Sequence, residues 1–224
     1  AGLFFWESNM GTLVGRNVRV EVSKTEGTAK DVTAVTVADP AVATSAAHAL
    51  SNGAVGYMKD VTGMVNLDGQ AVRLSAVDTN TFTLQGVDAS QFPAYTGGDL
   101  IPVTAWSTLA RSSGYSIGGG DAAKQDDTCL LDTITQEING LLAAETVTIN
   151  IKKQTIDEEA LQLVRKAARN QAYLVWRITL VDGSMRIFRG QPSMPGEDVQ
   201  VGAIGTGSLS VTVKGAVLYL PPVA

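Results

Sequence analysis

The fold class follows from residues 41–98, which read AVATSAAHALSNGAVGYMKDVTGMVNLDGQAVRLSAVDTNTFTLQGVDASQFPAYTGG. Short segments in which apolar and polar residues alternate are separated by turn-forming pairs such as Asn52-Gly53 and Asp68-Gly69. Asn, Asp and Gly adopt the positive φ angles that tight hairpin turns require, and alternation is typical of a strand with one buried face. We therefore predict a run of β-hairpins here and not a helix.

Strand patterns continue on both sides of this stretch. Residues 16–23 read RNVRVEVS and place three valines on one face, which predicts a strand. Further along, two segments alternate small polar residues with isoleucine or valine, which predicts strands with one apolar and one polar face. The polar faces consist of Thr133, Thr135 and Glu137 in the first segment, and of Thr146, Thr148 and Asn150 in the second.

One amphipathic helix is predicted after these strands. Thr155 and Glu158 have the spacing of a capping box, in which each side chain bonds the other residue's backbone N–H. An apolar stripe at helical spacing follows, and Asn170 is the expected C-cap. The stripe consists of Ile156, Ala160, Leu163, Val164 and Ala167.

Charge divides the chain into two parts. Residues 27–99 hold seven acidic and three basic residues, a net charge of −4, whereas the remainder has a net charge of only −1. This difference and the hairpin pattern predict a discontinuous domain of residues 1–26 and 100–224 with an inserted small β-barrel domain of residues 27–99. We expect a mainly β protein, in which a β-sandwich or half-barrel with one packed α-helix carries the insert.

Composition restricts the function classes. The chain of 224 residues has 45% hydrophobic and 17% charged residues, which leaves a lean charged surface, as expected of a subunit that packs against copies of itself. The net charge of −5 argues against general affinity for duplex DNA. No apolar run approaches the roughly 20 residues that span a membrane. Cys129 is the single cysteine, which excludes an internal disulfide and fits a reducing cytoplasm.

Catalytic and ligand-binding motifs are weak. His48 is the single histidine and lies in a predicted turn, which argues against Ser-His-Asp and Cys-His nucleophiles. Asp126, Asp127 and Asp132 come nearest to a metal site but lack the EF-hand spacing, so we interpret them as a solvated loop. The glycines at 118–120 lack the Gly-Lys-Ser/Thr end of a phosphate loop. We predict no catalytic residue, no cofactor and no metal.

Three arginines in a predicted hairpin, Arg177, Arg186 and Arg189, lie close in sequence to Trp176 and Phe188. Basic residues beside aromatic ones can bind nucleic acid. In a net-negative chain we favour the other interpretation, that they form ion pairs between subunits.

Two parts of the sequence resemble known protein families. The words AVATSAAHALSNG, VTGMVNLDGQAVRLSAVDTNTFTLQGVD and AYTGG resemble a small β-barrel module of bacteriophage tail proteins, which is similar to one domain of ubiquitin-activating enzymes. The ordered words TITQEINGLLAAETVTINI, IDEEALQLVRKAARN, AYLVWRITLVDGSMRIFRG and GSLSVTVKGAVLYL resemble the tube protein of long-tailed phages.

The resemblance to phage tube proteins implies a structural virion subunit and not an enzyme. It implies hexameric rings stacked into a hollow tail tube, assembled in the host cytoplasm, with a continuous β-barrel lining the lumen. The implied partners are other copies of the chain and the tape measure, tail terminator and tail-tip proteins, while DNA passes through without specific binding. The polar faces listed above are the candidate lumen residues, since hydroxyls and acids do not hold the phosphate backbone.

Subunit contacts are expected at three places. The arm Leu3, Phe4, Phe5 and Trp6 would be an exposed apolar patch unless a neighbouring subunit covers it. The Ser- and Gly-rich segment from 107 to 125 is expected to be a flexible loop that orders in the assembly, with Tyr115 and Ile117 anchoring it to the adjacent ring. The insert is expected to face outward and to be dispensable for ring formation.

Two other classes of function remain open at this stage. The first is a carbohydrate- or receptor-binding adhesin module, for which the insert offers no Trp and only Tyr57 and Tyr95. The second is a hydrolase, which the single histidine disfavours.

Overall fold

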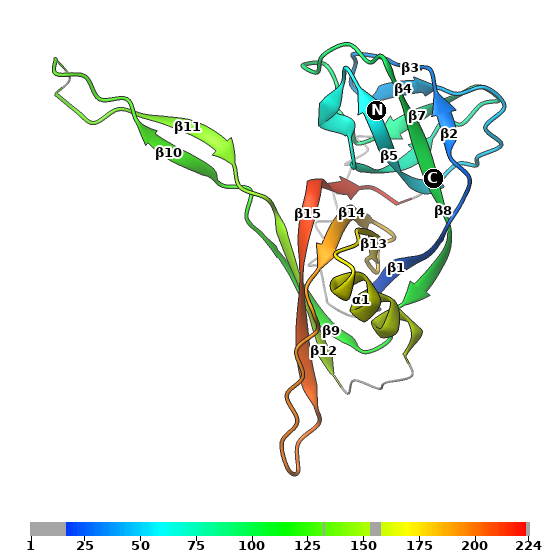
Figure 1. Cartoon of the computed structure of the whole chain (residues 1–224), viewed down its shortest axis with the longest axis vertical. Coiled ribbons are helices and arrows are strands. Elements are labelled where there is room, and N and C mark those ends of the chain that lie inside the picture. Colours follow the sequence, from blue (N-terminus) through cyan, green and yellow to red (C-terminus); the bar gives the residue numbers. More distant parts are fainter. Residues whose placement is uncertain (1–16, 132, 153–157, 223–224) are drawn as a thin grey trace, which may run out of the picture.

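The computed structural model describes residues 17–131, 133–152 and 158–222. Within these residues the chain is mainly β with a single α-helix, as the sequence predicts. Figure 1 shows a curved sheet that carries the helix, a β-rich lobe above it and a long two-stranded ribbon that projects away from both.

The lower part of the main sheet is antiparallel, in the strand order β8-β1-β13-β14-β15-β12-β9. Its strands are β1 (Arg19–Glu26), β8 (Gly97–Thr108), β9 (Ser112–Gly118), β12 (Thr146–Lys152), β13 (Leu174–Thr179), β14 (Met185–Pro192) and β15 (Thr206–Leu220). Val20 and Val22 of β1 are buried and Val18 packs beside them, so the predicted strand is confirmed.

Helix α1 (Glu159–Arg169) packs against this sheet and contacts β1, β8 and β14. The core between helix and sheet contains Ala160, Leu161 and Val164 from the helix and the fully buried Trp176 and Phe188 from the sheet. Trp176 and Phe188 are cross-strand neighbours whose rings stack at 6.2 Å.

The predicted capping box is wrong. Glu158 is the N-cap residue and not the third residue of the helix, and its side chain makes no cap hydrogen bond. Its Oε1 instead accepts a 2.7 Å hydrogen bond from the backbone N–H of Ala110. Thr155 lies outside the described residues. Asn170 is the C-cap, as predicted.

Residues 27–99, which we call the module, form the upper lobe. Its elements are β2 (Lys30–Val32), β3 (Ala34–Val35), β4 (Ala41–Thr44), β5 (Val55–Thr62), the 3-10 turn η1 (Val65–Leu67), β6 (Ala71–Ser75) and β7 (Thr81–Gln85). Gly53 and Gly69 have φ of 78° and 79°, which is the turn geometry that the sequence predicts. A separate core fills the lobe, and Met58, Phe82 and Leu100 are completely buried in it.

The module and the lower sheet are continuous, because β8 pairs with β5 in the module and with β1 below it. A third apolar cluster lies between the two lobes, and we call it the junction. It consists of Val55, Tyr57, Ala71 and Ile101 from the upper side, and Val175, Ile187 and Leu220 from the lower side.

The ribbon consists of β10 (Ala122–Asp126) and β11 (Glu137–Leu142), which pair only with each other. It connects β9 to β12 and extends away from the body (Figure 1). The predicted flexible loop at 107–125 is therefore wrong, because β9 and most of β10 occupy it. Thr133 and Thr135 precede β11 at the far end of the ribbon, so the strand predicted there is also wrong.

Candidate assembly surfaces

A face of small uncharged polar residues covers three adjacent strands. Thr146, Thr148 and Asn150 of β12 lie opposite residues of β15 on one side and of β9 on the other. Directly paired residues of neighbouring strands share a face of the sheet. We call this surface the polar face, and it consists of Gly114, Ser116, Gly118, Thr146, Thr148, Asn150, Ser208, Ser210 and Thr212.

The opposite face of the same strands is the core. Val147, Ile149 and Ile151 alternate with the polar residues of β12 and are buried in the same core cluster as the apolar residues of α1. This alternation points the polar face away from the core of the chain. The residues of the polar face are uncharged, so a phosphate backbone that runs along them meets neither a cation nor a carboxylate from the face itself. Lys152 at the end of β12 and Lys214 of β15 fall on the same side of the sheet by alternation and flank the face.

The predicted lumen residues fall into two groups. Thr146, Thr148 and Asn150 belong to the polar face. Thr133, Thr135 and Glu137 lie on the ribbon and are exposed. That all six line a lumen stays a prediction.

Strand β9 forms one edge of the main sheet. It pairs with β12 only, so no strand lies along its other side in the described part of the chain. Edge strands usually carry Lys, Pro or a bulge that prevents pairing with another chain. The residues of β9, SSGYSIG, include neither Lys nor Pro. The register of β9 against β12 shifts between Ser112 and Gly114, so the regular part of the edge runs from Gly114 to Gly118. Tyr115 and Ile117 are partly buried against this chain's own core, and their contact with an adjacent ring stays a prediction.

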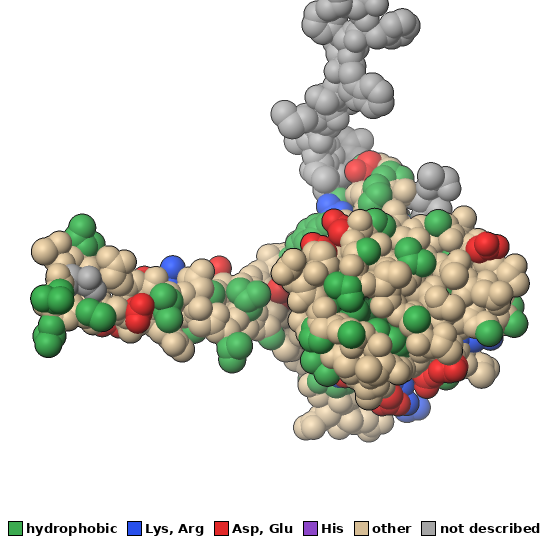
Figure 2. All heavy atoms as spheres, turned by 90° about the horizontal axis from the view of Figure 1, so that it is seen from above, with side chains coloured by type: hydrophobic (Ala, Val, Ile, Leu, Met, Phe, Trp, Pro, Cys, Tyr) green, Lys and Arg blue, Asp and Glu red, His purple; other side chains and the backbone are tan. Residues whose placement is uncertain are grey.

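The ribbon exposes large apolar side chains. Leu130 and Leu131 at its tip are 106% and 95% exposed, and Figure 2 shows hydrophobic side chains at its end and along its length. Further exposed apolar residues of the ribbon are Ile134, Ile138, Leu141 and Leu142. Residues 121–142 also hold five acidic residues and one lysine. Apolar exposure on this scale marks a surface that another molecule covers.

A second apolar group lies at the other end of the sheet. The connection between β14 and β15 exposes Met194, Val199, Val201 and Ile204. Figure 1 shows this connection at the bottom of the molecule, whereas the ribbon extends to the upper left. Two different apolar surfaces at opposite ends suit head-to-tail contacts, which build rings or filaments.

Polar contacts hold the junction together. The Gln70 side chain is buried and clamps the backbone of Ala216: its Nε2 donates to the carbonyl oxygen at 2.9 Å, and its Oε1 accepts from the N–H at 2.8 Å. Lys214 Nζ donates to Asp68 Oδ2 at 2.8 Å. Tyr57 donates to Glu26 Oε2, and burial together with the Glu26 charge raises the pKa of Tyr57 to about 12.

The arginines of the predicted hairpin act within the chain. Arg177 donates to the buried Glu21 carboxylate at 2.8–2.9 Å and lies over the Trp106 ring. Arg189 lies over the rings of both Tyr57 and Tyr173, and Arg186 lies over Tyr219. Our expectation of inter-subunit ion pairs is therefore wrong for Arg177, whose charge is used internally.

The candidate reactive groups are isolated. His48 is 1% exposed, accepts a hydrogen bond from Leu50 N–H at Nδ1 and packs edge-on against Phe82. Asp126 accepts hydrogen bonds from Thr128, which lower the pKa of its carboxyl group. In residues 17–131, 133–152 and 158–222, no three His, Cys, Asp or Glu side chains group as metal ligands would. The same residues contain no helix of the length and hydropathy needed to cross a bilayer.

The module does not present an aromatic binding platform through its tyrosines. Tyr57 is 5% exposed, and Tyr95 donates to the carbonyl oxygen of Val32. The apolar arm Leu3, Phe4, Phe5 and Trp6 lies outside the described residues.

Comparison with known proteins gives one family. A family model described as phage tail tube protein matches residues 62–218, a range that includes the polar face, the ribbon and about half of the module. No curated protein matches the sequence. The matched range supports the tube-protein resemblance, while the likeness of the module to ubiquitin-activating enzymes stays a prediction.

Proposed function

The chain belongs to the phage tail tube protein family and is a structural subunit of the virion tail, and we propose that it assembles into stacked hexameric rings that conduct the genome. The number six comes from the family resemblance. In this proposal the tube domain consists of residues 1–26 and 100–224, the module of residues 27–99 faces outward, and no reaction is catalysed. Rings form in the host cytoplasm and meet the tape measure, terminator and tip proteins at the tube ends.

The observation that carries the proposal is the exposed apolar ribbon. Burying one leucine side chain contributes about 1.5–3 kcal/mol, and the ribbon holds six large aliphatic residues that its own chain leaves open. A monomer gains nothing from such a surface and risks aggregation. A neighbouring ring that receives the ribbon removes this surface from water.

The polar face is our candidate for the lumen. Lysines or arginines along a DNA channel would release counterions and hold the duplex at every ring. Hydroxyl, amide and glycine surfaces give DNA no such favourable contact. The open edge of β9 supports lateral pairing with the next subunit, which would continue the sheet around the ring.

Negative-stain electron microscopy of concentrated protein tests the proposal. We expect rings or tubes from the natural sequence and only monomers from the double variant Leu130→Ser/Leu131→Ser, with the melting temperature unchanged. The matched control is Val65→Ser, which removes an exposed valine of the module (62% exposed) and should leave the tubes intact. Monomers from the natural sequence at all concentrations would contradict the proposal and favour an adhesin.

A further inference from the structure

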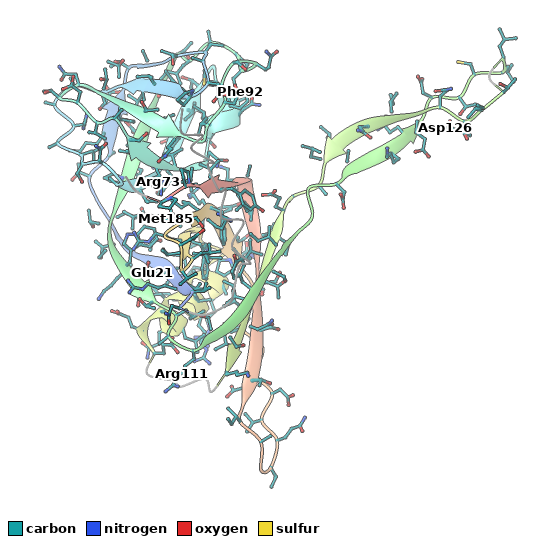
Figure 3. All side chains as sticks on the ribbon, turned by 180° about the vertical axis from the view of Figure 1, so that it is seen from behind. Glu21, Arg73, Phe92, Arg111, Asp126 and Met185 are labelled. Atoms are coloured by element: carbon teal, nitrogen blue, oxygen red, sulfur yellow. The ribbon has the colours of Figure 1, made fainter. Side chains whose placement is uncertain are left out.

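Arg73 is a buried cation in the module. It lies on β6 opposite Gln85 of β7 and Val55 of β5, and only 1% of its surface is exposed. Figure 3 labels it beside the end of β15, at the boundary between the two lobes.

The hydrogen bonds of Arg73 leave its charge without a counter-charge. Its Nε donates to Gln85 Oε1 at 2.7 Å and its Nη2 donates to the Pro221 carbonyl oxygen at 2.6 Å, and both acceptors are neutral. Its Nη1 is buried and has no partner among the described residues. Burial lowers the pKa of the guanidinium, which is the direction expected for a cation that has lost water.

An unpaired buried charge is costly, and arginine cannot escape the cost by losing its proton. Proteins pair such groups or bind an ion at them. No ion pair in the described part of the chain includes Arg73.

A hollow of about 370 Å³ adjoins Arg73. Asn52 and Ser75 also line it, and Pro221 and Pro222 close one side. Asn52 Oδ1 accepts from Val77 N–H at 3.0 Å, so the end of this amide that stays available is the N–H donor. The lining residues include no carboxylate, and the polar groups that they offer are mainly donors.

We propose that this hollow binds a small oxyanion, a carboxylate or a phosphate group, with Arg73 as the charged partner and Asn52 and Ser75 as hydrogen-bond donors. Guanidinium is the side chain best matched to both anions, because its planar N–H groups can donate to two oxygens at once. A carboxylate would come from an acidic side chain of a protein partner, and a phosphate from solution. Because both probes are small ions added to the free chain, the test below does not depend on ring assembly.

Thermal unfolding of the full chain tests the site with two probes, inorganic phosphate and acetate, each compared with sodium chloride at equal ionic strength. A specific site occupied at about 100 times its Kd should raise the melting temperature by about 5 °C. Phosphate also stabilises proteins without specific binding. The deciding comparison is therefore the rise in melting temperature in each variant against the rise in the natural protein, and not the rise over sodium chloride alone.

Two variants and one control make the test specific. Arg73→Gln removes the charge and should abolish the specific rise. Asn52→Asp keeps the acceptor for Val77 N–H and adds a carboxylate inside the hollow, so it should melt above the natural protein in chloride and gain nothing from either probe. Arg186→Gln removes an arginine outside the hollow and should keep the full rise.

The pattern across probes identifies the source of the anion. A rise with acetate that exceeds the rise with phosphate supports a carboxylate from a protein partner, and the reverse supports free phosphate. The proposal would be overturned if the melting temperature rises equally in the natural protein and in Asn52→Asp, or if neither probe raises it. Both outcomes can be read even if Arg73→Gln fails to fold.

Discussion

The junction and the ribbon both gather large aliphatic residues on antiparallel strands, yet only one of them is covered. At the junction, Val175 and Ile187 are completely buried by the module. On the ribbon, Leu141 and Leu142 are 89% and 74% exposed. Apolar surface buried within one chain contributes to folding, and apolar surface left open contributes only when another molecule arrives. The two regions therefore separate the part of the chain that stabilises the subunit from the part that we propose joins subunits.

The largest effect is expected from replacing residues 27–99 by a Gly-Ser linker. The sequence suggests a dispensable module, but the contacts at the junction make the opposite result the expected one. Removal exposes Val175, Ile187 and Leu220 together, and it deletes β5, which pairs with β8. We expect circular dichroism and thermal melts to show no cooperative folded state.

The matched control for that replacement is a shortened ribbon, with residues 127–136 replaced by Asn-Gly. This variant should fold and melt like the natural protein, since residues 127–131 and 133–136 are all exposed. If the linker variant folds and forms tubes, the module is dispensable for both folding and assembly.

Single substitutions compare the stability contributions of the junction and the ribbon one side chain at a time, with smaller expected effects. Ile187→Ala opens a cavity in the junction and should cost about 2–5 kcal/mol of unfolding free energy. Leu141→Ala changes an exposed side chain of the ribbon and should cost less than about 0.5 kcal/mol. Urea denaturation of both variants below the concentration of assembly measures the difference. Equal costs would mean that the ribbon is covered in the monomer.

The sequence predicted the regular parts of the fold well. Alternation placed Val20, Val22, Val147 and Ile149 on buried faces, and the Asn-Gly and Asp-Gly pairs marked turns of the module, because both signals depend on neighbours in the chain. The helix was found, but its start was misplaced, because the carboxylate of Glu158 bonds Ala110, a residue 48 positions away. Local capping rules do not include such a partner.

The assembly surfaces were only partly predictable. Thr146, Thr148 and Asn150 carry a strand pattern, yet their neighbours Ser116 and Ser210 join them only through strand pairing that is remote in sequence. The leucines of the ribbon were missed, because alternation cannot distinguish a strand beside a core from one that projects into solvent. A signal was available in the five acidic residues interspersed among them, which are unusual beside a core.

A polar contact tests the junction at a finer scale. Gln70→Ala removes both hydrogen bonds between the buried Gln70 amide and the backbone of Ala216. We expect a loss of about 1–3 kcal/mol, since each of the two hydrogen bonds contributes about 0.5–1.5 kcal/mol net. Gln191→Ala, a partly buried glutamine on β14, is the control and should change unfolding free energy by less than about 0.5 kcal/mol. A neutral Gln70→Ala would show that water replaces the clamp.

The smallest expected effect is the pH dependence of the contact between Lys214 and Asp68. The hydrogen bond from Lys214 lowers the pKa of the Asp68 carboxyl below its ordinary value of 3.8. A carboxyl group whose pKa is lower in the folded than in the unfolded state stabilises the fold above the unfolded pKa, and this contribution is lost as the pH falls through the folded pKa. Both side chains are about one-third exposed, so solvent screening limits the contribution to about 0.5 kcal/mol.

Lys214→Met keeps the aliphatic stem and should lose this amount of unfolding free energy at pH 6. Lys214 Nζ also lies 5.8 Å from the centre of the Tyr173 ring, a contact that does not depend on Asp68. The decisive measurement is therefore the difference in unfolding free energy between the natural protein and Lys214→Met at pH 6, minus the same difference at pH 2.5. A value of zero would mean that the ion pair adds nothing to the junction, whose stability would then come from its apolar cluster and the Gln70 clamp.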